Sequence, residues 1–452
     1  MHFLIKKFSP IILFNSLLIF IYIFYKSEFY WNGDKRDYYF NYYIISLLLI
    51  FFSVITFYIK QKIKEYLIIT TISLLVSIYV FEGFLIFTKL SKEQLYKKQT
   101  RIDWDVRSRS EIYEDLKKLN NEIVVKVAPT NYLNKNYSIF PVAGVSNSKT
   151  IYCNEEGYYS IYQSDRYGFN NPDNEWDKKE IEYLLVGDSF THGACVNRPN
   201  DITSVLRTLS NKSALNLGYG SNGPLVEYVA LREYLNSNVK KVLWIYYEGN
   251  DLGNLEYEKK DNILINYLND LTFTQDLKLK QNDINNLALN IIERERERER
   301  ERKRENEKEN KKENKKNFKF EIQNFIKIAN IRTSIFQPPN YSRPPEPQPS
   351  PEFEKILKIT KDLTIQNNSK LYFVYLPEYS RYKTKYDDKN YNLVKNIVSK
   401  LNIPFIDIHE KIFKKEQNPL KLFPFGELNS HGHYNIEGYK KVAETLYKYT
   451  KD

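Results

Sequence analysis

The run at 187–193, Gly-Asp-Ser-Phe-Thr-His-Gly, carries the side chains of a nucleophilic site directly after an apolar stretch. A serine hydroxyl attacks an ester carbonyl once a neighbouring base removes its proton. A glycine-containing turn into a helix lifts that hydroxyl and points backbone N–H groups at the carbonyl oxygen. Alone the signal is weak, because Asp188 and Ser189 are also ordinary helix-capping residues. A Gly-Asp-Ser triplet also arises by chance in roughly one chain of this size in ten.

Three further polar blocks come later in the sequence. They are Asn-Leu-Gly-Tyr-Gly-Ser-Asn-Gly-Pro at 216–224, Glu-Gly-Asn-Asp at 248–251 and His-Gly-His-Tyr-Asn-Ile-Glu-Gly-Tyr at 431–439. An amide such as that of Asn250 donates hydrogen bonds to a developing oxyanion, and an imidazole such as that of His433 serves as a general base. Together the four blocks contain the groups that acyl transfer through a serine requires.

The elements around these blocks alternate between strands and helices. We expect near-continuous apolar strands at 183–186, 214–217, 242–247, 371–376 and 404–408. We expect helices at 202–209, 224–235, 391–401 and 436–449. Apolar strands separated by helices predict an α/β fold with a parallel sheet covered on both faces. The first three blocks then lie at the carboxyl ends of strands, where such sheets expose their reactive groups.

The ordered set of four blocks resembles the SGNH (GDSL-type) hydrolases over about residues 160–450, minus an insertion. The resemblance implies the three-layer fold of that family, with Ser189 as nucleophile and His433 as general base. It also implies an oxyanion hole formed by the Ser189 N–H, a backbone N–H at Gly220 or Ser221, and the Asn250 side chain. His192 and His431 lack the family context and are expected to be surface or capping residues.

Two positions depart from the family pattern. The glycine of the second block falls on Ser221, with Gly220 beside it, so the exact backbone donor stays open. The aspartate three residues before the histidine is replaced by Ser430. We therefore expect a Ser189–His433 dyad whose histidine titrates near 6.5, with Asp188 and Ser430 as supporting residues. Asp407 and Glu427 are candidates for a replacement acid by proximity in sequence only.

Composition narrows the function classes. The formal charge is +11, but the low-complexity run 293–316 contributes 12 Lys and Arg against 9 Glu, and no compact basic stripe indicates nucleic-acid binding. Only Cys153 and Cys195 are present, which excludes a cysteine-based zinc cluster and leaves one disulfide or two free thiols equally open. The sequence has no dinucleotide or phosphate-loop fingerprint, so we expect no cofactor and no metal.

Three apolar stretches, 8–25, 42–59 and 66–88, have the length of membrane-spanning helices, and only Glu82 interrupts them. The first is followed by no small-residue cleavage site, so we expect it to be retained. With the N-terminus inside, the segments that flank the three stretches place five Lys and Arg residues inside and eight outside. Because positive residues favour the inside, this count weakly disfavours an exported C-terminal domain. The resemblance to the SGNH hydrolases, whose membrane-anchored members mostly act on envelope material, instead predicts an extracytoplasmic domain, and we follow it.

These observations predict a membrane region at 1–90, a polar connector at 91–150, and an SGNH-like domain at 151–452. That domain carries a charged and Pro-rich insertion at about 255–352, most simply a solvated helix or disordered tract with a stiff linker. The leading hypothesis is a multi-pass, membrane-anchored serine esterase or O-acyltransferase acting on acyl esters, acetyl foremost, of envelope glycans or lipids. The alternative is an inactive SGNH-like domain that binds acylated glycan, and an interaction scaffold is third. The oligomeric state, acyl group and acceptor stay open.

Overall fold

The structure is a computed structural model that describes residues 2–33, 35–88, 91–335, 346–383, 386–428 and 432–451. The chain forms two compact units. The first comprises residues 1–90 and 305–342, and the second comprises residues 91–304 and 343–452. The second unit contains all four polar blocks.

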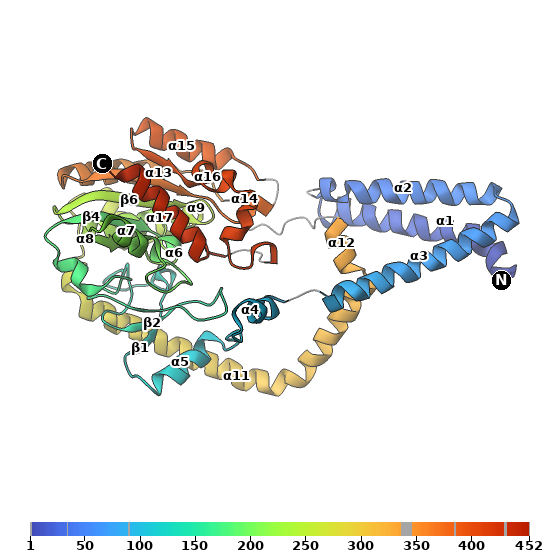
Figure 1. Ribbon diagram of the computed structural model, residues 1–452, viewed down its shortest axis with the longest axis horizontal. Coiled ribbons are helices and arrows are strands. Elements are labelled where there is room, and N and C mark those ends of the chain that lie inside the picture. Colours follow the sequence, from blue (N-terminus) through green and yellow to red (C-terminus); the bar gives the residue numbers. More distant parts are fainter. Residues whose placement is uncertain are drawn as a thin grey trace. The chain divides into compact units, whose positions relative to one another are not determined.

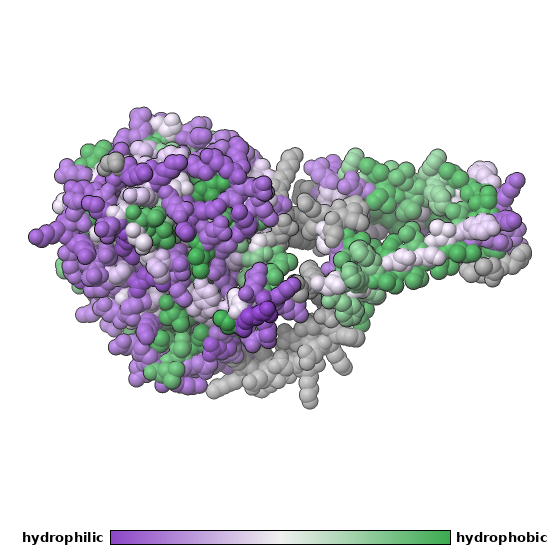
Figure 2. Space-filling model, in the orientation of Figure 1, coloured by the Kyte–Doolittle hydropathy of each residue, from purple (hydrophilic) through white to green (hydrophobic). Residues whose placement is uncertain are grey.

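Three long helices form most of the first unit: α1 (His2–Phe24), which continues as a π-helical segment (Tyr25–Tyr30), α2 (Arg36–Tyr58) and α3 (Gln61–Thr88). Each is long and apolar enough to cross a membrane. Their large side chains face outward, as for Phe14 at 62% and Phe51 at 66% exposure. Apolar side chains cover these helices in Figure 2. A helix apolar on all sides is matched to lipid, not to the one-sided core of a soluble protein.

Five parallel strands form the central sheet of the second unit, in the order β5-β4-β6-β7-β8 (Figure 1). The strands are β4 (Ile181–Gly187), β5 (Ala214–Asn216), β6 (Val239–Tyr247), β7 (Lys370–Leu376) and β8 (Phe405–Asp407). Every predicted strand is present, so the expected α/β class with a parallel sheet is confirmed.

Both faces of the central sheet are buried, each in its own apolar core. Neighbouring residues of β6 alternate between the cores: Trp244 lies in one and Ile245 in the other. Helices α8 (Pro224–Tyr234), α13 (Pro351–Gln366) and α15 (Lys389–Lys400) cover the first face. Helices α7 (Ile202–Ser210) and α17 (Ile436–Thr450) cover the second. Burial on both faces explains the uninterrupted apolar runs in the sequence.

A second, smaller sheet has the strands β1 (Ile123–Val125), β2 (Lys149–Ile151) and β3 (Ile161–Gln163), with β1 and β2 parallel and β2 and β3 antiparallel. The helices α4 (Lys92–Thr100) and α5 (Arg109–Lys117) precede it. Residues of this region, among them Phe140 and Val142, belong to the same core as α8. The segment expected to be a polar connector is thus a folded part of the second unit.

The insertion after β6 is largely helical: α9 (Asp251–Glu258), α10 (Asn262–Asn269), α11 (Gln281–Ile326) and α12 (Ala329–Ile335). Its first part packs into the core through Leu264, Leu277 and Ile284. The charged run at 293–302 continues α11 as a helix, with Arg296 paired to Glu114 of α5. Most of the Pro-rich tract, 336–345, lies outside the described residues.

Candidate active site

The nucleophile block forms a tight turn between β4 and the short helix α6 (Ser189–His192). A Cβ added to Gly187 would lie 2.1 Å from Thr191 Oγ1 and 2.6 Å from the Ile245 carbonyl oxygen, so only glycine fits. Asp188 caps α6 by accepting the Phe190 N–H through Oδ1 at 2.9 Å. This turn holds the Ser189 side chain at the carboxyl end of β4, where it is 7% exposed.

His433 lies between Ser189 and a carboxylate that the sequence did not indicate. Its Nε2 is 2.9 Å from Ser189 Oγ, and its Nδ1 is 3.0 Å from Glu155 Oε1. The other oxygen of Glu155 accepts the backbone N–H of His433 at 2.8 Å. Glu155 therefore fixes both the main chain and the ring of His433, which leaves Nε2 free to take the serine proton.

This geometry corrects the expected dyad. Burial by itself would lower the pKa of His433, but the charge and hydrogen bond of Glu155, with the charge of Asp188, raise the pKa above its ordinary value. A histidine titrating near 6.5 was expected only because no carboxylate was placed beside it. Glu155 lies before the region that resembles the SGNH family, so the family pattern gave no signal for it.

A disulfide between Cys153 and Cys195 ties the Glu155 loop to the nucleophile block. Cys153 precedes Glu155 by two residues, and Cys195 closely follows α6, with its sulfur 3.7 Å from His433 Nδ1. Glu155, Cys195 and His433 together have the donor types of a metal site. Because a metal binds the thiolate and the Cys195 sulfur is bonded to Cys153, this group lacks its sulfur ligand.

Asn250 and the second block both contact the nucleophile turn, the second block through the Tyr219 N–H, which donates to the Gly187 carbonyl oxygen at 3.2 Å. The Asn250 amide donates to Asp188 Oδ2 at 3.3 Å, which also accepts from Ser189 Oγ at 3.1 Å. Ser221 has φ +77°, a left-handed conformation that favours glycine. Ser221 therefore differs from the family's glycine in its side chain but has a backbone conformation that is typical of glycine. Among the described residues, no backbone carbonyl accepts the N–H of Ser189 or of Ser221.

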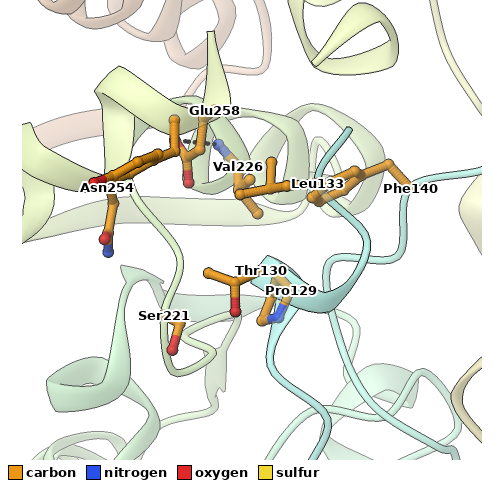
Figure 3. A pocket seen from close by; sticks show the side chains of 9 residues that line it. Pro129, Thr130, Leu133, Phe140, Ser221, Val226, Asn254 and Glu258 are labelled. Carbon is orange, nitrogen blue, oxygen red and sulfur yellow. Dashed lines mark hydrogen bonds between the residues drawn. The ribbon is translucent and has the colours of Figure 1, made fainter. Parts of the chain in front are cut away.

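A small pocket lies beside Ser221 (Figure 3). Its volume is ≈ 10 Å³, about the space of one water molecule. The lining residues come from the segment between β1 and β2 and from the segments that follow β5 and β6. They are Pro129, Thr130, Leu133, Phe140, Ser221, Val226, Asn254, Tyr257 and Glu258.

Other candidates from the sequence lie elsewhere. Asp407 does not contact His433; it accepts from the Tyr391 hydroxyl at 2.5 Å and from the Glu410 N–H at 3.1 Å. His192 is 1% exposed among Tyr152, Tyr162 and Tyr219, so the expectation of a surface or capping residue is wrong. Burial lowers the pKa of His192 to about 3, which keeps the ring neutral. Ser430, His431 and the side chain of Glu427 lie outside the described residues.

The first three polar blocks thus follow β4, β5 and β6 at one edge of the central sheet, and the fourth block precedes α17 and reaches Ser189. The domain is an α/β fold with a five-stranded parallel sheet, and the four blocks meet as the resemblance to the SGNH hydrolases leads us to expect. A glutamate from the region of the smaller sheet, Glu155, contacts the ring of His433.

Comparison with solved structures finds neighbours at low similarity. They are a protein from Desulfitobacterium hafniense described as lipolytic and of the G-D-S-L family (14% identity, TM-score 0.30), an acetyl xylan esterase (12%, 0.31) and a phospholipase A1 from Streptomyces albidoflavus (8%, 0.32). Each alignment covers 60% of this chain and 99% of the other. No family model and no curated protein matches the chain. At this similarity no activity or substrate is transferred from these proteins.

Proposed function

We propose that the protein is a serine esterase or O-acyltransferase that forms an acyl-enzyme on Ser189. The observation that carries the proposal is the hydrogen-bonded series from Ser189 Oγ through His433 to Glu155, at 2.9 and 3.0 Å. A nucleophile, a base and an orienting carboxylate in this order are the arrangement of serine hydrolases.

The chemistry proceeds in two halves. His433 Nε2 takes the proton as Ser189 Oγ bonds to the acyl carbon, and the resulting oxyanion is held by the Ser189 and Ser221 N–H groups and the Asn250 amide. His433 then gives the proton to the departing alcohol as the ester bond breaks. In the second half, water or an acceptor hydroxyl loses its proton to His433 and attacks the acyl carbon. His433 then returns the proton to Ser189 Oγ as the bond between Oγ and the acyl carbon breaks. Asp188 orients Asn250 throughout.

An alternative function, binding of acylated glycan without turnover, had two grounds in the sequence. One was the missing acid at Ser430, and the other was the divergent second block at Ser221. Glu155 supplies an acid at His433 Nδ1, and Ser221 keeps a glycine-type backbone. Both observations support turnover over binding alone.

The proposed substrates are O-acyl esters of envelope glycans or lipids, with acetyl foremost, and the proposed anchor is α1–α3 spanning the membrane. We place the N-terminus inside and the catalytic domain outside. The Cys153–Cys195 disulfide supports this side, because disulfides persist in oxidising compartments. Alkaline phosphatase fused after the C-terminus should be active, and an active cytoplasm-only reporter there would contradict the orientation.

Labelling with a serine-directed fluorophosphonate tests the proposed chemistry. The full-length protein in detergent should be labelled, and Ser189→Ala should abolish the label. Ser210→Ala is the matched control, since the Ser210 hydroxyl donates within α7 to the Leu206 carbonyl. A wild-type protein that stays unlabelled, or a Ser189→Ala variant that is still labelled, would overturn the proposal.

A further inference from the structure

One buried cation beside the oxyanion hole has no part in the proposed proton transfers. Lys126 directly follows β1 and is 6% exposed. Its Nζ donates to the Gly220 carbonyl oxygen at 2.8 Å. Among the described residues, Lys126 forms no ion pair with a carboxylate. Burying an ammonium without such a partner is costly, so its position calls for an explanation beyond packing.

We infer that Lys126 is a positioning residue of the oxyanion hole, whose ammonium holds the Gly220–Ser221 peptide so that the Ser221 N–H faces the substrate oxygen. The inference rests on the proposed function and adds a residue to its machinery. The Gly220 carbonyl and the Ser221 N–H belong to one planar trans peptide and point in opposite directions. Holding the carbonyl outward therefore holds the N–H inward.

The backbone conformation of Ser221 explains why the Gly220–Ser221 peptide needs a hydrogen bond that keeps its orientation. A left-handed φ of +77° is unfavourable for serine, because its Cβ approaches the backbone carbonyl oxygen. Turning the Gly220–Ser221 peptide by half a turn would return φ of Ser221 to the negative side. The same turn would aim the Gly220 carbonyl oxygen into the hole, where it would repel an oxyanion. The hydrogen bond from Lys126 opposes this turn.

The absence of a side chain at Gly220 leaves room for the Lys126 ammonium. A Cβ there would lie 2.0 Å from the Tyr152 hydroxyl and 3.0 Å from Lys126 Nζ, so a larger residue would displace the contact. The rings of Tyr152 and Tyr219 lie 5.0 and 4.6 Å from Nζ and stabilise the cation through their faces. The neighbours therefore accommodate an ammonium at this point and leave it directed at Gly220.

The charge of Lys126 adds to its effect on the peptide. A cation bound at the carbonyl polarises the peptide and strengthens its N–H as a donor. Burial, with the charge of Arg109, lowers the pKa of Lys126 to about 7, and the charge of Asp188 acts in the opposite direction. The charge of Lys126 in turn disfavours protonation of His192 and His433.

These directions set the pH dependence. Activity needs His433 neutral, so the rate rises with pH through the histidine's pKa. Activity also needs Lys126 charged, so the rate falls as the ammonium deprotonates. We expect a bell-shaped profile of kcat/KM on a short-chain nitrophenyl ester, with an alkaline limb that belongs to Lys126.

Two substitutions separate orientation from charge. Lys126→Met should lower kcat about 10- to 100-fold, within the range for a weakened oxyanion donor, with KM changed less than about threefold. Lys126→Gln keeps a neutral donor and should retain more activity than Lys126→Met. Both should lose the alkaline limb. The matched control is Lys241→Met, which removes a lysine of β6 that is 5% exposed and paired with Glu182 of β4.

The outcomes distinguish this inference from the proposed function. Lys241→Met should lower stability and leave kcat and the pH profile unchanged. Folded Lys126 variants that keep the alkaline limb and kcat within threefold would overturn the positioning role, while continued labelling of Ser189 would leave the proposed function standing. If neither Lys126 variant folds, the wild-type profile decides, because a profile without an alkaline limb contradicts the inference.

Discussion

The central sheet and the smaller sheet contribute different kinds of group to the same site. The central sheet and its connections supply the groups that the proposed mechanism brings to the substrate: Ser189, Asn250 and His433. The region of the smaller sheet, residues 123–163, supplies Glu155 and Lys126, which act on His433 and on the Gly220 peptide. The reacting groups and the groups that position them are therefore separated in the sequence.

The separation teaches how the site is held together. Parallel strands bring Ser189 and Asn250 to one edge of the sheet through backbone hydrogen bonds alone. Glu155 lies in the loop that joins β2 to β3, which is held by backbone hydrogen bonds between Tyr152 and Ser160 and between Ser160 and Cys153. The disulfide from Cys153 to Cys195 additionally ties this loop to the nucleophile block. Packing of the smaller sheet's region against the central sheet therefore sets the orientation of His433. The central sheet itself sets the position of Ser189.

The largest effect should come from the central-sheet side. His433→Ala removes the base that activates Ser189, and we expect kcat/KM on a nitrophenyl ester to fall by about 10⁴-fold or more. Asp407→Asn is the control, because Asp407 contacts Tyr391 and not the site. An Asp407→Asn variant as inactive as His433→Ala would show that the site has been assigned to the wrong residues.

The next effect concerns the oxyanion donor from β6's end. Asn250→Ala should lower kcat by about 10²–10³-fold, the usual effect of losing one such donor, with KM little changed. Asn390→Ala is a matched loss of an amide, since Asn390 on α15 bonds to the Glu346 and Pro347 carbonyls. A fall in substrate binding with kcat preserved would mean that Asn250 holds the ground state and not the transition state.

The strands and helices around the central sheet could be predicted because apolar runs and glycine-containing turns are local patterns. The resemblance carried by the four blocks pointed to Ser189, Asn250 and His433, and the structure brings these three side chains close together around Ser189 and Asp188. Glu155 could not be found this way, because its approach to His433 depends on how two segments 278 residues apart pack. The strands of the smaller sheet are three residues each, too short to show a period, which is why 91–150 looked like a connector.

A smaller effect should follow from removing the Cys153–Cys195 disulfide, which links the region of the smaller sheet to the nucleophile block. The double variant Cys153→Ser/Cys195→Ser should lose about 2–4 kcal/mol of unfolding free energy and several-fold in kcat, because Glu155 becomes less well ordered. Thermal unfolding and ester kinetics measure the two effects. A thiol reductant should reproduce the loss in the wild type and change nothing in the double variant. Full activity of the reduced wild type would show that Glu155 is held by packing alone.

The central claim is that Glu155, from the smaller sheet's region, orients His433, and the pH profile of Glu155→Gln tests it most directly. Glu155 raises the pKa of His433 against the opposing effect of burial, so the rising limb of wild-type kcat/KM should lie above 6.5. In Glu155→Gln only burial and weaker charges act, so that limb should move to lower pH, with kcat reduced by about 10²–10⁴-fold. Glu156→Gln is the matched control, because burial raises the pKa of that carboxyl to about 7 and it accepts from the Ile436 N–H. A Glu155→Gln variant with the wild-type limb and wild-type kcat would contradict the account.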